Sequence, residues 1–144
     1  MPTVSVVMPA KNEAEGLRRT LPALRAAFPD AELIVVDDGS TDDTAAVAAA
    51  AGARVLSSPY SMGNGAAIKR GARAATHEVI VFMDADGQHD PAQIPLLLAQ
   101  IEAGHDMVVG ARDGSGQASV GRGLANRLYN GLASWMTGHS IDDL

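Results

Sequence analysis

The sequence contains no cysteine and few aromatic residues, and both absences restrict what the chain can be. Without cysteine there are no disulfide bonds, no thiol chemistry and no zinc sites built from thiolates, which fits a cytoplasmic protein. Aromatic residues make up 3% of the 144 residues, whereas hydrophobic residues make up 47%. The chain is therefore predicted to form a single globular domain, residues 1–144, with a core of small aliphatic side chains.

Basic residues and long apolar runs are also scarce. The chain has 11 lysines and arginines against 17 acidic residues, which gives a net charge of −6. Because a broadly basic surface is absent, a nucleic-acid-binding protein is disfavoured. No stretch reaches about 18 apolar residues, so no transmembrane helix is predicted. The N-terminal region lacks the basic start and apolar core of a signal peptide, and it is predicted to begin the fold with a strand.

Short runs rich in β-branched residues alternate with helical patterns along the chain. Strands are predicted at residues 3–8, 32–37, 54–57, 78–83 and 106–110. Helices are predicted in between. The first runs from Leu17 to Phe28, and Pro22 should kink or restart it; the second is capped by Ser40 or Thr41 and ends at Gly52. Three more are predicted over residues 64–75, from near Pro91, and from Leu124 to Trp135. Residues 110–123 are predicted to form a long glycine-containing loop. This alternation predicts an α/β fold with a mainly parallel central sheet covered by helices on both faces.

A pair of acidic residues follows the most apolar run of the chain, residues 79–83. Asp84 and Asp86 are two positions apart, and side chains at this spacing in an extended chain point the same way. Two carboxylates held close together repel each other unless a cation lies between them, and Mg²⁺ suits carboxylates, water and the oxygens of a diphosphate. The alternative is an Asp-rich turn after a buried strand. The three residues Asp84-Ala85-Asp86 alone support the metal site and the turn about equally.

Polar residues also follow two other predicted strands. Asp37 and Asp38 follow the second strand, and residues 9–13 (Pro-Ala-Lys-Asn-Glu) follow the first. Ligands of open α/β sheets bind beyond the carboxyl ends of strands, so three strand ends at one rim favour a ligand site over a simple turn. The carboxylate of Asp37 or Asp38 can accept hydrogen bonds from a nucleotide base or ribose. For Asp38 alone, a structural cap of the turn is almost equally well supported.

Other candidate residues give weaker signals. Residues 63–65 (Gly-Asn-Gly), at the start of a predicted helix, resemble a glycine-rich anion site, although close contact between helix and sheet explains the glycines as well. Lys69 is the functional candidate on that helix. Arg112 is either a phosphate ligand or a solvated surface residue. His89 and His139 are predicted to be structural rather than metal ligands.

Taken together, these motifs closely resemble those of family 2 glycosyltransferases with the GT-A fold. The resemblance rests on residues 7–13, 35–40, 63–65, 83–89 and 110–112, in this order, and it covers essentially the whole chain. Within this family, the chain most resembles the branch that contains polyprenyl- and dolichyl-phosphate mannosyl- or glucosyltransferases. The resemblance implies a Rossmann-like nucleotide-diphospho-sugar transferase fold, a three-layer sandwich around the parallel sheet.

The resemblance also implies roles for particular residues. Asp84 and Asp86 are the implied catalytic pair, with Asp84 facing the ribose and diphosphate. Asp86, together with Gln88 and Asp84, should hold Mg²⁺ or Mn²⁺ against the diphosphate, and Asp37 should contact the base. The implied nucleotide-sugar-binding residues are Pro9, Asn12, Glu13, Asp37, Asp38, Lys69, Asp84, Ala85, Asp86 and Arg112.

The implied activity is metal-dependent, inverting transfer of a hexose from a nucleotide-diphosphate sugar of the GDP-mannose or UDP-glucose type, with polyprenyl phosphate as the first candidate acceptor. One alternative is a saccharide hydroxyl as acceptor. Another is a donor-binding module without turnover, because related enzymes typically continue beyond the counterpart of residues 141–144 with the acceptor side. Lys11 and Gly87, where related enzymes often carry Tyr and Leu, leave the substrate class open. A sugar-phosphate nucleotidyltransferase is disfavoured, because its glycine-rich basic signature does not follow the first strand.

The last predicted helix carries an apolar stripe of Leu124, Leu128, Leu132 and Trp135. Such a stripe can lie on a bilayer surface, but contact with the protein core is favoured about two to one. The resemblance implies a cytoplasmic protein, with peripheral association at the cytoplasmic face of a membrane as a further expectation.

Overall fold

The structure is a computed structural model and describes residues 1–110 of the chain. In sequence order its elements are β1 (Val4–Ala10), α1 (Ala14–Ala27), β2 (Glu32–Asp37), α2 (Thr44–Ala50), β3 (Arg54–Ser57), α3 (Asn64–Ala74), β4 (Val79–Phe82), the 3-10 helix η1 (Pro91–Gln93) and α4 (Ile94–Glu102). All of these elements lie in one compact unit, Met1–Ala103, and a second unit begins at Gly104. A single domain over all 144 residues stays a prediction.

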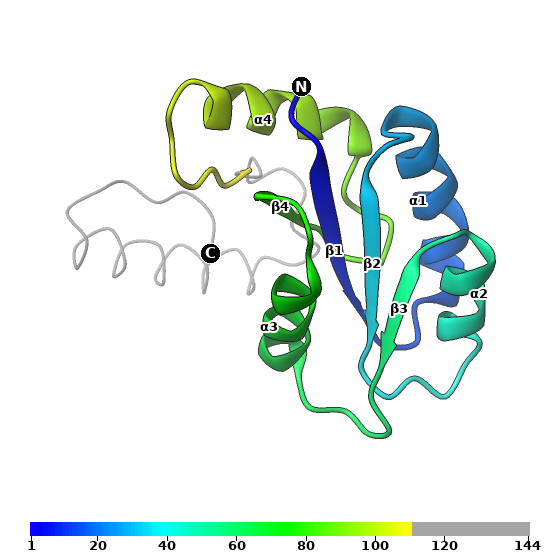
Figure 1. The fold of residues 1–144 in the computed structure, drawn as a ribbon. Coiled ribbons are helices and arrows are strands. Elements are labelled where there is room, and N and C mark those ends of the chain that lie inside the picture. Colours follow the sequence, from blue (N-terminus) through cyan, green and yellow to red (C-terminus); the bar gives the residue numbers. More distant parts are fainter. Residues whose placement is uncertain (111–144) are drawn as a thin grey trace, which may run out of the picture. The chain divides into compact units, whose positions relative to one another are not determined.

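The strands form one sheet in the order β3-β2-β1-β4, and every neighbouring pair is parallel (Figure 1). In this register Val6 of β1 pairs with Leu33 of β2 on one side and with Val81 of β4 on the other. The predicted parallel sheet is therefore confirmed. Because the strands share one direction, their carboxyl ends meet at a single edge, where the polar residues of the sequence motifs follow them.

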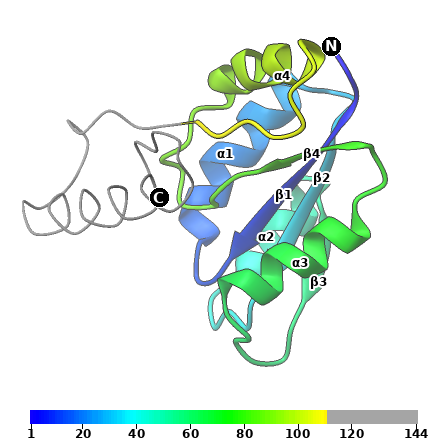
Figure 2. The ribbon, with the colours of Figure 1, turned by 90° about the vertical axis from the view of Figure 1, so that its left-hand side faces the viewer.

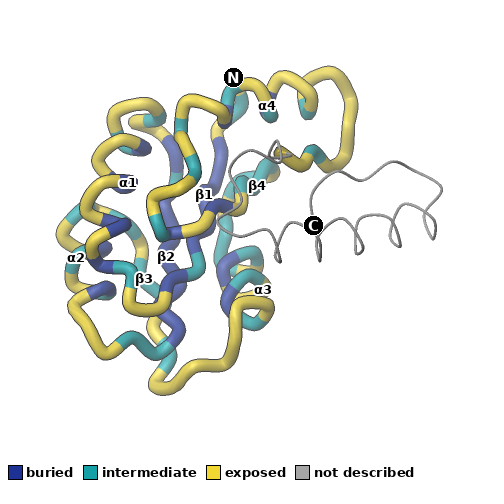
Figure 3. The backbone as a smooth tube through the Cα atoms, turned by 180° about the vertical axis from the view of Figure 1, so that it is seen from behind, coloured by how far each residue is buried: buried dark blue, intermediate teal, exposed yellow. Residues whose placement is uncertain are grey.

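Helices cover both faces of the sheet. Helices α1 and α2 lie on one face and α3 on the other (Figures 1 and 2). Alternate residues of β1 serve the two faces, as the pleat of a strand requires: Val6 and Met8 belong to the larger core with α1, whereas Val7 belongs to a smaller core under α3. Figure 3 shows the buried positions concentrated along β1 and β2. Both strands are thus buried on two faces, which explains their nearly continuous apolar sequences.

The predicted fifth strand, residues 106–110, is wrong. Residues 106–110 are described, but they form neither strand nor helix. Two of their three large apolar side chains are open to solvent, with Met107 79% and Val109 66% exposed, and Val108 is half-buried. A β-branched run forms a strand only where a neighbouring strand supplies hydrogen bonds and a surface to pack on, and no strand pairing of the described residues includes this run.

Two predicted helix features are also wrong. Helix α1 continues through Pro22 from Ala14 to Ala27 without the predicted restart, because Leu17 and Leu21 are fully buried and hold the helix on the sheet while Pro22 is exposed; a kink at Pro22 stays a prediction. Helix α2 begins at Thr44 instead of directly after Ser40 or Thr41. The reason is that residues 40–42 bond to the loop of Asn12, as described below. Gly52 does follow the end of α2 as predicted, with a φ of +75°.

Within residues 1–110, no helix is both long enough and apolar enough to cross a bilayer. The predicted last helix from Leu124 to Trp135, the predicted loop beyond Gly110, and the candidate residues Arg112 and His139 lie outside the described residues.

Candidate functional site

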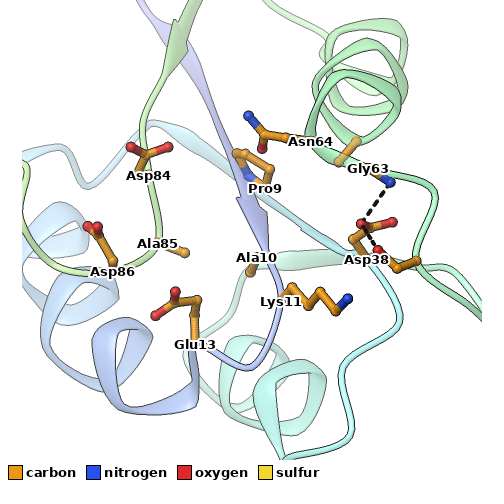
Figure 4. A pocket seen from close by; sticks show the side chains of 12 residues that line it. Pro9, Ala10, Lys11, Glu13, Asp38, Gly63, Asn64, Asp84, Ala85 and Asp86 are labelled. Carbon is orange, nitrogen blue, oxygen red and sulfur yellow. Dashed lines mark hydrogen bonds between the residues drawn. The ribbon is translucent and has the colours of Figure 1, made fainter. Parts of the chain in front are cut away.

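A cavity of about 370 Å³ opens at the carboxyl edge of the sheet (Figure 4). The ends of β1, β2 and β4 all contribute to it, together with the start of α3. Among residues 1–110, those that line it are Pro9, Ala10, Lys11, Glu13, Asp38, Ser61, Gly63, Asn64, Ala67, Asp84, Ala85 and Asp86. The three polar clusters that follow strands in the sequence therefore meet at one cavity, and this favours the ligand-site interpretation over isolated turns.

Asp37 and Asp38 point to different places although both are buried, each with 6% of its surface exposed. Ile34 and Val36 of β2 belong to the core under α3, and Asp38 continues that row towards the start of α3. Asp37 points the other way, accepts a hydrogen bond from the Ser40 N–H at 3.0 Å, and does not line the cavity. The alternation of side chains along a strand thus separates two adjacent aspartates.

The Asp38 carboxylate fastens the loop that leads into α3. It accepts hydrogen bonds from the Met62 N–H at 2.7 Å, from the Ser61 hydroxyl at 2.7 Å and from the Gly63 N–H at 3.0 Å. The bonds from Met62 and Ser61, helped by that from Gly63 and by the Lys11 charge, lower the pKa of Asp38 even though burial acts to raise it. Asp38 is therefore ionised at neutral pH, and both of its carboxylate oxygens accept hydrogen bonds from residues 61–63.

Asn12 joins two loops at the rim and does not line the cavity. Its side-chain oxygen accepts hydrogen bonds from the N–H groups of Thr41 at 2.8 Å and Asp42 at 3.3 Å, and its own N–H donates to the Ser40 hydroxyl at 2.9 Å. Asn12 has a φ of +54°, the left-handed conformation that Asn tolerates better than most residues. The next residue, Glu13, does line the cavity, and its N–H donates to the Thr44 hydroxyl at 3.0 Å.

The acidic segment after β4 forms a turn, whereas an extended chain was predicted. Ala85 and Asp86 lie in the turn, and Gly87 continues it with a φ of +81°. One Asp86 oxygen accepts the Gln88 N–H at 2.9 Å, and Ala85 is buried in the core. Asp84 and Asp86 nevertheless both line the cavity, on the side opposite Asp38 and Gly63 (Figure 4).

His89 lies beside Asp84. Its Nδ1 accepts the Asp84 N–H at 3.2 Å, and its Nε2 is 3.8 Å from an Asp84 carboxylate oxygen. These contacts tie the two ends of the acidic turn together, and the structural role of His89 stays a prediction.

The donor set fits a divalent cation that a ligand helps to hold. Among residues 1–110, no three His, Asp or Glu side chains converge as a metal cluster. Asp84 and Asp86 supply two carboxylates to the cavity, and the Asp84 side chain is 55% exposed. Mg²⁺ and Mn²⁺ are oxygen-seeking ions, and Mg²⁺ is commonly held by one or two carboxylates together with substrate phosphates and water. Two carboxylates at one cavity are thus compatible with such a site, whose remaining ligands would be water and phosphate oxygens.

The structure brings together part of the predicted set. Of the predicted residues, those that line the cavity are Pro9, Glu13, Asp38, Asp84, Ala85 and Asp86, and those described but not lining it are Asn12, Asp37, Lys69 and Gln88. Lys69 is exposed, because Asn64, Ala67 and Gly71 occupy the inner side of α3 at helical spacing. The roles of all these residues stay predictions.

The cavity also contains residues outside the implied set of binding residues: Ala10, Lys11, Ser61, Gly63, Asn64 and Ala67. Four of them lie in predicted segments, since Ala10 and Lys11 belong to the motif after β1, and Gly63 and Asn64 to the candidate anion site at residues 63–65. Ser61 and Ala67 carry no sequence signal of their own.

Several known proteins have sequences related to this chain. A family model described as "Glycosyl transferase family 2" matches residues 5–141. An uncharacterized glycosyltransferase of Mycobacterium tuberculosis is 43% identical over 109 residues, which are 76% of this chain and 48% of that protein. An undecaprenyl-phosphate 4-deoxy-4-formamido-L-arabinose transferase of Photorhabdus laumondii is 37% identical over 152 aligned positions, covering 97% of this chain and 46% of that protein. The chain thus spans about half the length of the curated relatives that it matches.

Solved structures of glucosyl-3-phosphoglycerate synthase from Mycobacterium tuberculosis have a similar fold. The complex with Mn²⁺, UDP-glucose and phosphoglyceric acid has a TM-score of 0.74 and 31% identity, covering 93% of this chain and 50% of that chain. The complex with Mg²⁺ and UDP has a TM-score of 0.60 and 36% identity, covering 69% of this chain and 39% of that chain.

Proposed function

Because the chain belongs to glycosyl transferase family 2, we propose that its cavity binds the nucleoside diphosphate of a sugar donor and that a hexose is transferred from this donor. The predicted family and the GT-A class of fold are confirmed by the family match and by the structural neighbours. The observation that carries the proposal is the convergence of the ends of β1, β2 and β4 on one cavity that contains Asp84 and Asp86.

Asp84 and Asp86 are the proposed ligands of Mg²⁺ or Mn²⁺. The similar glucosyl-3-phosphoglycerate synthase was crystallised with either ion and UDP, which supports this assignment. Such an ion, when bound, offsets the negative charge that develops on a departing diphosphate. Gln88 is not a proposed side-chain ligand, because its described contact is made through its backbone N–H and it lies outside the cavity lining.

Anion binding on the other side of the cavity is assigned to α3 and Lys11. Gly63 and Asn64 line the cavity at the amino end of α3, an 11-residue helix. The amino end of a helix carries partial positive charge and free N–H groups, which favour phosphate oxygens. Lys11 lines the same cavity and adds a full positive charge. Asp38, Asn12 and the loops they fasten would hold these donors in place before a ligand arrives.

The proposed acceptor is a polyprenyl phosphate. Its support is the 37% identity to an undecaprenyl-phosphate sugar transferase across 97% of this chain. Such an acceptor is already an anionic nucleophile and needs little help from a base, whereas a saccharide hydroxyl would need a carboxylate near its proton. Donor binding without transfer is the second candidate function, because all the described residues that line the cavity belong to the unit Met1–Ala103.

Calorimetric titration with UDP, GDP, UDP-glucose and GDP-mannose, each with Mn²⁺ and with EDTA, tests donor binding. One of these nucleotides should bind the wild type, and Mn²⁺ should clearly increase its affinity. The Asp86→Asn variant should lose this gain, because it keeps an oxygen for the Gln88 N–H but removes the charge. Asp30→Ala, which removes an exposed carboxylate away from the cavity, is the control and should behave as wild type. Equal Mn²⁺ gains in wild type and Asp86→Asn would refute the metal assignment.

Transfer of radiolabelled sugar to polyprenyl phosphate then tests turnover. Labelled lipid that depends on Mn²⁺ and on Asp86 supports the transferase. Donor binding without labelled lipid, and without labelled saccharide, supports the second candidate.

A further inference from the structure

The acidic turn lies directly against the first turns of α1. Gly16 of α1 is buried, and a Cβ atom at this position would be 2.2 Å from the carbonyl oxygen of Ala85. It would also be 2.9 Å from the carbonyl carbon and 3.0 Å from the Cα of Asp86. Side-chain carbon atoms do not approach backbone atoms this closely. Any residue other than glycine at this position therefore requires the helix or the turn to move.

The contact between α1 and the turn extends beyond Gly16. The Thr20 hydroxyl donates a hydrogen bond to the Gly16 carbonyl oxygen at 2.9 Å, and Thr20 is buried. Thr20 and the Arg19 guanidinium lie next to Gly87, since a Cβ on Gly87 would be 3.7 Å and 3.5 Å from their nearest atoms. One side of α1 thus supports the turn over residues 85–87.

The core anchors the same segment from the sheet side. Met83 and Ala85 are buried in the core cluster that also contains Leu17 of α1. The turn therefore has little freedom to move towards the sheet, and a larger residue at position 16 would push it away from α1. Asp86 would move with it, because its backbone atoms are among those in contact.

We propose that Gly16 is a positioning residue of the donor site, whose missing side chain lets the turn of Asp84 and Asp86 approach α1 and so sets where the two carboxylates stand. This inference rests on the proposed function. An added methyl group at Gly16 requires the Ala85 oxygen to withdraw by about 1 Å to reach ordinary van der Waals distance. Metal–oxygen distances tolerate only about 0.2 Å, and a misplacement of about 1 Å can lower activity about a hundredfold.

Gly71 provides a matched control. It is also a buried glycine inside a helix, and a Cβ there would be 2.3 Å from Cγ1 of Val7, almost the same clash as at Gly16. The clash at Gly71 falls on valine side chains in the core under α3, away from the acidic turn. Gly16→Ala and Gly71→Ala receive the same gain in helix propensity, so they differ mainly in what the new methyl group displaces.

The test compares UDP and GDP binding to wild type, Gly16→Ala and Gly71→Ala, with Mn²⁺ and with EDTA, at low temperature and with folding checked by circular dichroism. Gly16→Ala should reduce the gain in affinity that Mn²⁺ provides about tenfold or more and leave affinity in EDTA unchanged, because the displaced turn carries the proposed metal ligands, whereas Lys11 and the start of α3 lie outside it. Gly71→Ala should keep the full Mn²⁺ gain even if its melting temperature falls.

A full Mn²⁺ gain in Gly16→Ala overturns the inference and leaves the proposed function standing. Equal losses of affinity with Mn²⁺ and with EDTA overturn it as well, since they would indicate a general loss of structure. So does a Gly16→Ala chain that fails to fold while Gly71→Ala folds, because the glycine would then serve the fold. Wild type that binds neither nucleotide overturns the proposed function and this inference together.

Discussion

Replacing Asp38 by asparagine should destabilise the chain, although the two side chains have the same shape. The carboxylate accepts the Met62 N–H on one oxygen and both the Ser61 hydroxyl and the Gly63 N–H on the other. An asparagine has only one oxygen. Whichever way its amide is turned, the NH₂ group faces either the Met62 N–H or the Gly63 N–H, and one hydrogen bond becomes a contact between two donors.

The expected loss can be estimated from these bonds. A hydrogen bond to a charged group contributes about 1.5–3 kcal/mol, and a neutral one about 1 kcal/mol. Residues 61–63 are exposed, so water can satisfy the displaced N–H in part. Asp38→Asn should therefore lower the free energy of unfolding by about 2 kcal/mol. For a chain of this size that corresponds to a fall in melting temperature of about 6 °C.

Asp37→Asn is the control, because Asp37 is the adjacent residue and is equally buried, with 6% exposed. Its carboxylate accepts the single N–H of Ser40, which an asparagine oxygen can still accept, so Asp37→Asn weakens one hydrogen bond but brings no two donors together. Urea unfolding and thermal unfolding of the two variants should therefore separate them clearly. Similar losses in both variants, or no loss in Asp38→Asn, would refute the assignment of Asp38 to the loop before α3.

The pH dependence of stability is a second way to test the prediction for Asp38→Asn. Because the pKa of Asp38 is lower in the folded chain than its ordinary value of 3.8, its contribution is fully present above pH 3.8 and is lost as the pH falls through the folded pKa. The difference in stability between wild type and Asp38→Asn should thus be largest near neutral pH and shrink in acid. A difference that stays constant down to the acid limit of folding would contradict the ionised carboxylate.

Three further predictions concern other contacts. Burial raises the pKa of Glu32, but hydrogen bonds from Ser5 and Thr76 lower it more, so it lies below 4.5. Glu32→Gln should therefore lower the free energy of unfolding by about 1–2 kcal/mol at neutral pH and by less in acid. Urea unfolding across pH measures this difference. Asn12→Gly relieves a positive φ but removes the acceptor for Thr41 and Asp42, so it should melt lower than wild type, whereas Asn12→Asp should restore most of the loss. EDTA should weaken nucleotide binding and should change the melting temperature of the nucleotide-free chain less than that of the nucleotide complex, because Asp84 and Asp86 supply two carboxylates and the proposed site needs the diphosphate as well.

Much of the sheet could be predicted from the sequence. The bounds of β2 and β3 agree with the predicted ranges, because short apolar runs between turn residues carry their own signal. The fifth predicted strand had the same local signal at Met107 and Val109 but has no neighbour to pair with among the described residues. Pairing is a property of the whole fold, so a single run of residues does not determine it.

The site was predictable at the level of segments and less so at the level of side chains. The rule that ligands bind beyond parallel strand ends correctly brought residues 9–13, 37–38 and 84–86 to one edge. Which residues face the cavity depended on finer geometry. The pleat of β2 sends Asp37 away, and the periodicity of α3 sends Lys69 outwards. Neither orientation could be read from residue type alone.

The polar residues around the cavity divide into two groups that mutation should distinguish. The side-chain oxygens of Asn12 and Asp38 accept hydrogen bonds from neighbouring loops, whereas Asp84 and Asp86 present carboxylates to the cavity. Variants of the first group should therefore lose stability and lose nucleotide affinity in parallel, with and without Mn²⁺.

Variants of the second group should lose affinity only where Mn²⁺ is present, at nearly unchanged stability. Asp84 illustrates why, since its side chain is 55% exposed and its removal leaves no buried partner unsatisfied. Plotting the change in nucleotide affinity against the change in unfolding free energy should place Asn12 and Asp38 variants on one line and Asp84 and Asp86 variants off it. An Asp84→Asn variant on that line would assign Asp84 to the loop framework and remove it from the metal site.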